Sequence, residues 1–72
     1  MTKARNVKFT KFGPESLLHQ NVCMSWRGRE LLGTVKQQTY CHTRGMVELG
    51  VYHFNGEPWP ISPVASAVKI IN

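Results

Sequence analysis

The sequence predicts an all-β fold, a small barrel of about five short strands with a 3₁₀ turn before the last strand. Residues 46–54 ("MVELGVYHF") alternate, with Val47, Leu49 and Val51 on one face. Asn55-Gly56 follows directly and indicates a hairpin with a type I′ turn, because both central residues of that turn need positive φ. A chain of 72 residues forms one domain, and closing a short sheet into a barrel removes its exposed edges.

The N-terminal third predicts a short arm followed by one strand. Residues 1–6 are basic and read as an arm, so that residues 7–72 form the single barrel domain. Residues 7–12 ("VKFTKF") alternate and predict the first short strand. The break "GPES" at residues 13–16 ends this strand.

The middle of the chain predicts two longer strands joined by a tight turn. Residues 21–26 ("NVCMSW") read as a strand, and residues 27–29 ("RGR") read as a glycine turn. Residues 30–40 ("ELLGTVKQQTY") read as the next strand, in which Gly33 indicates a bulge or a sharp bend. The loop "CHTRG" at residues 41–45 leads into the alternating segment described above.

The C-terminal segment predicts the end of the barrel. Residues 57–61 return from the hairpin as a strand, and their two prolines restrict it to an edge. Residues 62–66 ("SPVAS") are too short for a full helix and predict a 3₁₀ turn before the last strand, "AVKII". This order of elements is that of an SH3-like barrel. An OB-like barrel is the main alternative, but it usually needs more residues and a helix between its middle strands.

Residues 59–72 ("WPISPVASAVKIIN") resemble the C-terminal end of the plasmid-borne type B dihydrofolate reductases, which are small SH3-like chains that assemble as tetramers around a central active-site pore. Ile61 and the triplet "PVA" at residues 63–65 match the pattern of that family. Pro60 and Ser62 stand where the family has its functional glutamine and tyrosine, so the functional residues are not retained. The resemblance implies an SH3-like barrel that self-assembles.

The charge balance favours a polyanionic partner. Nine lysines and arginines face four glutamates, for a formal net charge of +5, and a basic domain of this size most simply binds nucleic acid. The candidate phosphate contacts are Lys3, Arg5, Lys8, Lys11, Arg27, Arg29 and Arg44.

The aromatic residues near turns and strand ends are candidates for stacking on bases or for binding another partner. Trp59 stands between Pro58 and Pro60, and we expect it to be displayed rather than buried. Trp26 and Tyr52 complete the set of candidate stacking or partner-binding residues.

The two cysteines are too few for a disulfide framework, and we expect them to pack as small hydrophobic residues in a reducing compartment. The alternative is a structural zinc site made of His19, Cys23, Cys41 and His42. Their spacing is not that of a recognised zinc motif, so we expect no metal and no cofactor. A catalytic thiol needs a pocket and a lowered pKa, and we expect no catalytic residue.

These observations predict a small non-catalytic binding module, with nucleic acid as the favoured partner. One alternative is a protein-interaction or self-assembling SH3-like module of a mobile element or phage, active as a homo-oligomer. Another is an oligomeric pore enzyme of the type B dihydrofolate reductase kind. No run of residues approaches the ~18 apolar residues that a membrane span requires, so we expect a cytoplasmic protein without a membrane partner.

Overall fold

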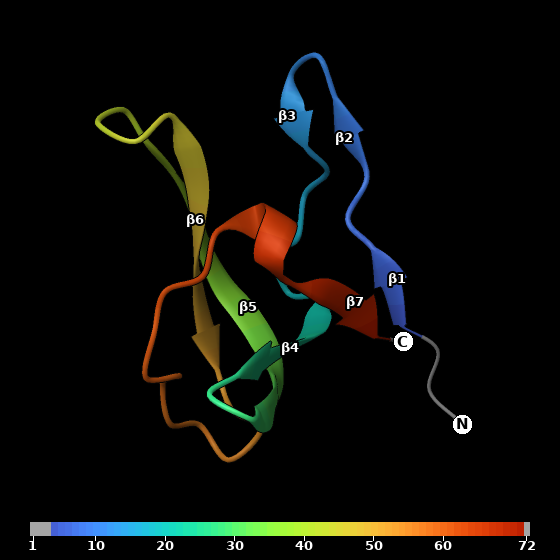
Figure 1. Cartoon of the computed structure of the whole chain (residues 1–72), viewed down its shortest axis with the longest axis vertical. Coiled ribbons are helices and arrows are strands. Elements are labelled where there is room, and N and C mark those ends of the chain that lie inside the picture. Colours follow the sequence, from blue (N-terminus) through green and yellow to red (C-terminus); the bar gives the residue numbers. More distant parts are fainter. Residues whose placement is uncertain (1–3, 72) are drawn as a thin grey trace.

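The computed structural model of the chain describes residues 4–71, which form an antiparallel five-stranded sheet of order β1-β7-β4-β5-β6 and a separate β2–β3 hairpin (Figure 1). The elements are β1 (Ala4–Asn6), β2 (Phe9–Thr10), β3 (Gly13–Pro14), β4 (Asn21–Trp26), β5 (Arg29–Cys41), β6 (Met46–Tyr52), the 3₁₀ turn η1 (Ala65–Ala67) and β7 (Lys69–Ile71). The predicted all-β fold with a 3₁₀ turn before the last strand is confirmed. Among these residues no helix is long and apolar enough to cross a membrane.

Within residues 4–71 the sheet does not close into a barrel, because β1 and β6 remain at opposite ends of the strand order. The free side of β6 is covered instead by the segment that leads to η1. Leu49 donates its N–H to the carbonyl of Pro63 at 2.8 Å, and Trp59 donates its N–H to the carbonyl of Val51 at 2.9 Å. The strand predicted at residues 57–61 is therefore wrong. Prolines lack the N–H that a continuous ladder needs, and only an isolated bridge between Tyr52 and Pro58 forms.

The core lies where the alternating strands place their apolar side chains. Val22, Val35, Leu49 and Ile70 come from β4, β5, β6 and β7, and each is almost fully buried. Leu17, from the segment between β3 and β4, is also buried in this cluster. The predicted inward face of β6 is thus confirmed, since Leu49 and its neighbours two residues away pack inward.

The predicted single strand at residues 7–12 is wrong, because this segment divides between two structures. Val7 is buried, and the chain then enters the β2–β3 hairpin, in which Phe9 pairs with Pro14. The Thr10 hydroxyl accepts the N–H of Phe12 at 3.1 Å, and Gly13 has φ of 108°. These turn contacts make the chain reverse direction at residues 11–12, although apolar and polar residues alternate in this segment as they do in a strand.

Half of the predicted arm is part of the sheet. Ala4–Asn6 pairs with β7, with Arg5 opposite Ile70, so the sheet begins before residue 7. Residues 1–3 lie outside the described residues.

The glycine turn predicted at residues 27–29 is confirmed, whereas the turn at Asn55-Gly56 is of another type than predicted. Arg27 and Gly28 have φ of 50° and 75° between the paired residues Trp26 and Arg29, which is the pattern of a type I′ turn. At Asn55-Gly56 the chain does reverse, but only Gly56 has positive φ, and its N–H donates to the carbonyl of His53 at 2.9 Å. The second turn is therefore a three-residue loop with glycine in the left-handed position, not the predicted type I′ turn.

No bulge lies at Gly33, because the register shift of β5 lies between Val35 and Gln37. A Cβ atom on Gly33 would lie 2.8 Å from Nε1 of Trp59 and would also overlap the carbonyl of Tyr52. Glycine is required here because another part of the chain approaches the strand closely.

Candidate binding cleft

A cleft of about 320 Å³ lies between the β2–β3 hairpin and the outer ends of β5 and β6. In Figure 1 the two hairpins stand apart at one end of the molecule, with η1 between them. The residues that line the cleft are Phe9, Phe12, Gly13, Pro14, Tyr40, Gly45, Met46, Val47, Val64, Ala65 and Ser66. The lining is therefore mostly apolar and comes from three separate parts of the chain.

Three aromatic rings of the cleft are exposed to solvent. Phe12 is 88% exposed, Phe9 54% and Tyr40 53%. Val47 is partly buried and Ala65 is buried, and both belong to or pack against the core. The cleft thus has a floor that is part of the folded domain and walls of aromatic surface available to a ligand.

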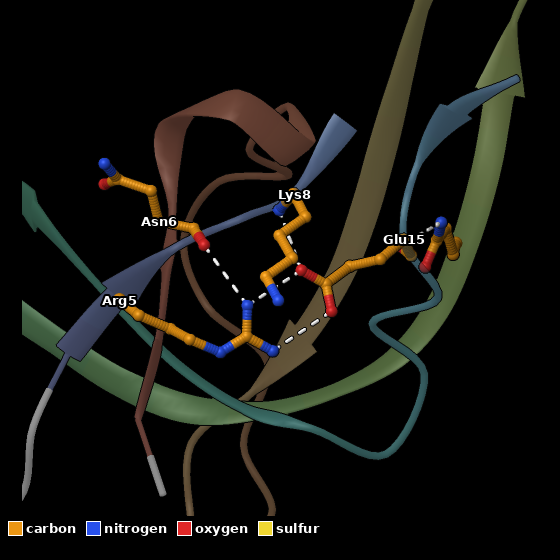
Figure 2. A network of polar contacts seen from close by, with 5 residues as sticks. Arg5, Asn6, Lys8 and Glu15 are labelled. Carbon is orange, nitrogen blue, oxygen red and sulfur yellow. Dashed lines mark hydrogen bonds and ion pairs between the residues drawn. The ribbon is translucent and has the colours of Figure 1, made fainter. Parts of the chain in front are cut away.

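Glu15 fastens the base of the β2–β3 hairpin, as Figure 2 shows. Its carboxylate accepts two hydrogen bonds from the guanidinium of Arg5, at 2.9 and 3.1 Å, and one from the N–H of Lys8 at 2.7 Å. The N–H of Glu15 in turn donates to the carbonyl of Lys8 at 2.8 Å. Glu15 therefore joins β1 and both legs of the hairpin.

The same contacts shift the proton equilibria of the pair. The hydrogen bonds from Arg5, and after them the hydrogen bond from the backbone of Lys8, lower the pKa of Glu15 from 4.5 to about 2. The hydrogen bond to Glu15 raises the pKa of Arg5. Glu15 is thus a carboxylate anion at neutral pH, and the positive charge of Arg5 balances it.

A second set of contacts fixes the hairpin to the sheet. The N–H of Leu17 donates to Oε1 of Gln38 at 2.8 Å, and Gln38 lies on β5. Nε2 of Gln38 donates to the carbonyl of Glu15 at 3.5 Å. Because Tyr40 lies two residues further along β5, these bonds set the hairpin opposite the tyrosine.

The predicted phosphate contacts do not form one surface. Lys8 and Lys11 are exposed on or beside the β2–β3 hairpin, and Nζ of Lys11 lies 5.2 Å from the ring centroid of Phe12. Arg27 and Arg29 lie at the β4–β5 turn, at the opposite end of the molecule from this hairpin (Figure 1).

The remaining predicted contacts are engaged elsewhere or are not described. Arg5 pairs with Glu15, and Arg44 pairs with Glu48, each at 2.9 Å. Lys3 lies outside the described residues. Lys8 and Lys11 form no ion pair among residues 4–71, and Lys11 lies against the ring of Phe12, which lines the cleft.

The prediction that Trp59 is displayed is wrong. Trp59 is 5% exposed, and its indole N–H donates to the carbonyl of Leu32 at 3.2 Å. The hydrogen bond from the N–H of Trp59 to Val51 holds its backbone against β6, and the absent side chain of Gly33 leaves room for the indole. Trp59 is a core residue and is not available for stacking.

The other two predicted stacking residues have different surroundings. Trp26 is partly buried against the core, and the guanidinium of Arg27 lies 4.8 Å from its ring centroid. Tyr52 is 38% exposed and lies away from the cleft lining. Sequence reasoning missed Phe9 and Phe12, although the interleaved letters "KFTKF" carry the signal of a basic and aromatic surface.

The alternative zinc ligands are not brought together. Within residues 4–71 no three His, Cys, Asp or Glu side chains are grouped so that they could hold a metal ion. Both cysteines are free. Burial raises the pKa of the Cys23 thiol, which makes it a poor nucleophile, and His42 packs edge-on against Tyr40 with ring centroids 5.0 Å apart.

Comparison of the chain with models of known protein families found no match, and comparisons with curated proteins and with solved structures found none either. The likeness of residues 59–72 to type B dihydrofolate reductases and the SH3-like assignment therefore stay predictions from the sequence.

Proposed function

We propose that this chain is a nucleic-acid-binding module whose interface is the cleft together with the adjoining face of the β2–β3 hairpin. One observation carries the proposal: Lys8, Phe9, Lys11 and Phe12 are all exposed on one short hairpin region that faces Tyr40 across the cleft. Cations neutralise phosphates while aromatic rings stack on bases, and alternation of the two along a surface suits a nucleic-acid strand.

The charges near the cleft support an anionic partner. Glu15 and Glu48 are each bound by an arginine, so neither carboxylate is left unmatched to repel a phosphate. The side chains of Lys8 and Lys11 form no ion pair among the described residues, and the amine of Lys11 lies beside the aromatic wall, 5.2 Å from the ring centroid of Phe12. The overall charge of +5 adds long-range attraction for a polyanion.

The test is binding of labelled mixed-sequence DNA and RNA, measured by fluorescence anisotropy from low to physiological salt. We expect affinity to fall as salt rises, because bound phosphates release counterions. The double variant Lys8→Gln with Lys11→Gln should make the negative slope of log K against log salt less steep. The expected change is about 0.9 for each phosphate of duplex DNA that loses its cation.

Arg27→Gln with Arg29→Gln is the matched control, since it removes the same charge from the opposite end of the molecule. This control should leave the salt slope nearly unchanged. No detectable binding at low salt, or binding without salt dependence, would contradict the proposed function.

A second candidate function is self-association, and a different surface favours it. Leu32 and Phe54 are 41% and 63% exposed, and with Ile71 they border a hollow of about 410 Å³ on the sheet. Adjacent exposed apolar side chains mark surfaces that another protein covers. Light scattering across a concentration series should then show an oligomer that Phe54→Ser disperses, whereas a monomer at every concentration would contradict this candidate.

A further inference from the structure

We infer that the cleft selects single-stranded over double-stranded nucleic acid by taking an unpaired base between the phenylalanines of the β2–β3 hairpin and Tyr40. This inference rests on the proposed function and adds the class of ligand and its placement. Phe9 and Phe12 line one wall of the cleft, and Tyr40 lines the wall that β5 and β6 form.

The size and the apolar lining of the cleft suit the face of one base. At about 320 Å³ it lies at the lower end of the ~300–1,000 Å³ range of small-ligand sites. Its floor includes Val47, Val64 and Ala65, and among the described residues no charged side chain lines it. The bases of a duplex have their faces stacked on each other, so only an unpaired base can cover this lining.

The charges favour a nucleotide over an apolar side chain of a peptide. The amine of Lys11 lies next to the aromatic wall and forms no ion pair within residues 4–71. Lys11 already lies over the ring of Phe12, and its flexible side chain reaches a phosphate on a base stacked there. A nucleotide therefore fits both the apolar lining, which its base covers, and the lysine amine, which its phosphate contacts.

The exposure of Phe12 makes it the sharpest probe. A ring that is 88% exposed contributes little to the core, so its removal changes binding without unfolding the domain. Leu18 is the control, because it is a large apolar residue, 42% exposed, that does not line the cleft.

The experiment compares three labelled ligands of equal length at one salt concentration: a pyrimidine single strand, a hairpin duplex, and a single strand whose central nucleotides are abasic. We expect the intact single strand to bind at least about 10-fold more tightly than the other two. Phe12→Ala should weaken its binding about 5- to 150-fold, the effect of losing one stacked base. The salt slope should be unchanged, because the phosphate contacts remain.

The control variants separate stacking from other effects. Leu18→Ala should leave all three affinities unchanged, and Phe12→Trp, which retains an aromatic face, should retain the affinity for the single strand. If duplex, abasic and intact strands bind equally and Phe12→Ala binds like the parent chain, the base-insertion inference is wrong while the proposed function stands. If none of the three ligands binds at low salt, the proposed function itself is wrong.

Discussion

The two ends of this molecule use the same kinds of residue in opposite ways. At the cleft end, Phe12 precedes a Gly-Pro pair and is 88% exposed. At the other end, Trp59 stands between two prolines and is 5% exposed. An aromatic residue within two positions of a proline is thus exposed in one region and buried in the other.

The backbone partner of each segment explains the difference. The N–H of Trp59 donates to the carbonyl of Val51, which holds the tryptophan against β6, and Gly33 leaves space for its ring. Phe12 lies at the tip of the β2–β3 hairpin, which forms a sheet of its own. The solvent exposure of each aromatic residue therefore depends on whether another strand packs against its segment, and not on its neighbours in sequence.

The largest expected effect comes from breaking the buried end. Trp59→Ala removes a large core side chain, and we expect a loss of about 3–5 kcal/mol in the free energy of unfolding. That is a large part of the ~5–15 kcal/mol typical of a domain. Urea denaturation measures it, with Phe12→Ala as the control that should stay within about 0.5 kcal/mol. Equal losses in the two variants would refute the comparison.

The next effect tests the close approach at Gly33. Gly33→Ala should destabilise the domain by about 1–3 kcal/mol, because the new methyl group would overlap the carbonyl of Tyr52 and the indole of Trp59. Repeating the change in a Trp59→Phe background should not restore stability, since the backbone carbonyl cannot move aside. Thermal unfolding of the four chains measures this, and an unchanged midpoint for Gly33→Ala would show that the close approach is absent.

A smaller effect on stability is expected at Glu15, whose carboxylate holds the base of the β2–β3 hairpin. The pKa of Glu15 is about 2 in the folded chain and 4.5 in the reference state. A lowered folded-state pKa means that its contribution is complete above pH 4.5 and is lost as the pH falls towards 2. Denaturation between these pH values should therefore show a loss of stability that is smaller in Glu15→Gln. Parallel pH profiles of the two chains would contradict the role of Glu15.

Glu15→Gln also tests the cleft directly. The uncharged amide binds Arg5 less strongly, so the β2–β3 hairpin should become more mobile at neutral pH. Amide hydrogen exchange of Thr10 and Gly13 should speed up, while exchange in β4 and β5 should not change. Identical exchange of the hairpin amides in both chains would show that other contacts hold it.

The smallest effect is expected at the β4–β5 turn. Arg27 has φ of 50°, a conformation that costs most residues ~1–2 kcal/mol. Arg27→Asn relieves part of this cost but removes the contact between the guanidinium and Trp26, worth ~0.5–1 kcal/mol at exposed sites. We expect a net change below about 0.5 kcal/mol in urea denaturation, and a loss above about 1 kcal/mol would show that the ring contact dominates.

The strands in which apolar and polar residues alternate regularly could be predicted from the sequence. The alternation of residues 46–54 placed Leu49 and Val51 on the buried face, and the boundaries of Asn21–Trp26 agree with the predicted strand. These elements carry their signal in neighbouring residues, because a strand with one buried face repeats every two positions. The 3₁₀ turn was predicted within a few residues of its place for the same reason.

The candidate cleft could be predicted only in part. The letters "KFTKF" show that cations and aromatic rings alternate, but the same letters fit a regular strand. The hairpin forms because the Thr10 hydroxyl accepts the N–H of Phe12 and Phe9 pairs with Pro14. The position of Tyr40 opposite these rings depends on the bond between Leu17 and Gln38, whose residues are far apart in sequence.

The sequence by itself determined the all-β class, the positive charge, the turns at residues 27–28 and 55–56 and the inward face of β6, because each depends on the composition or on residues close together in the chain. Only the tertiary structure decided that Trp59 is buried, that Gly33 is a point of close approach and that two hairpins enclose a cleft. Each of these depends on which distant backbone segment lies against the residue, and burial is a property of that packing rather than of the side chain alone.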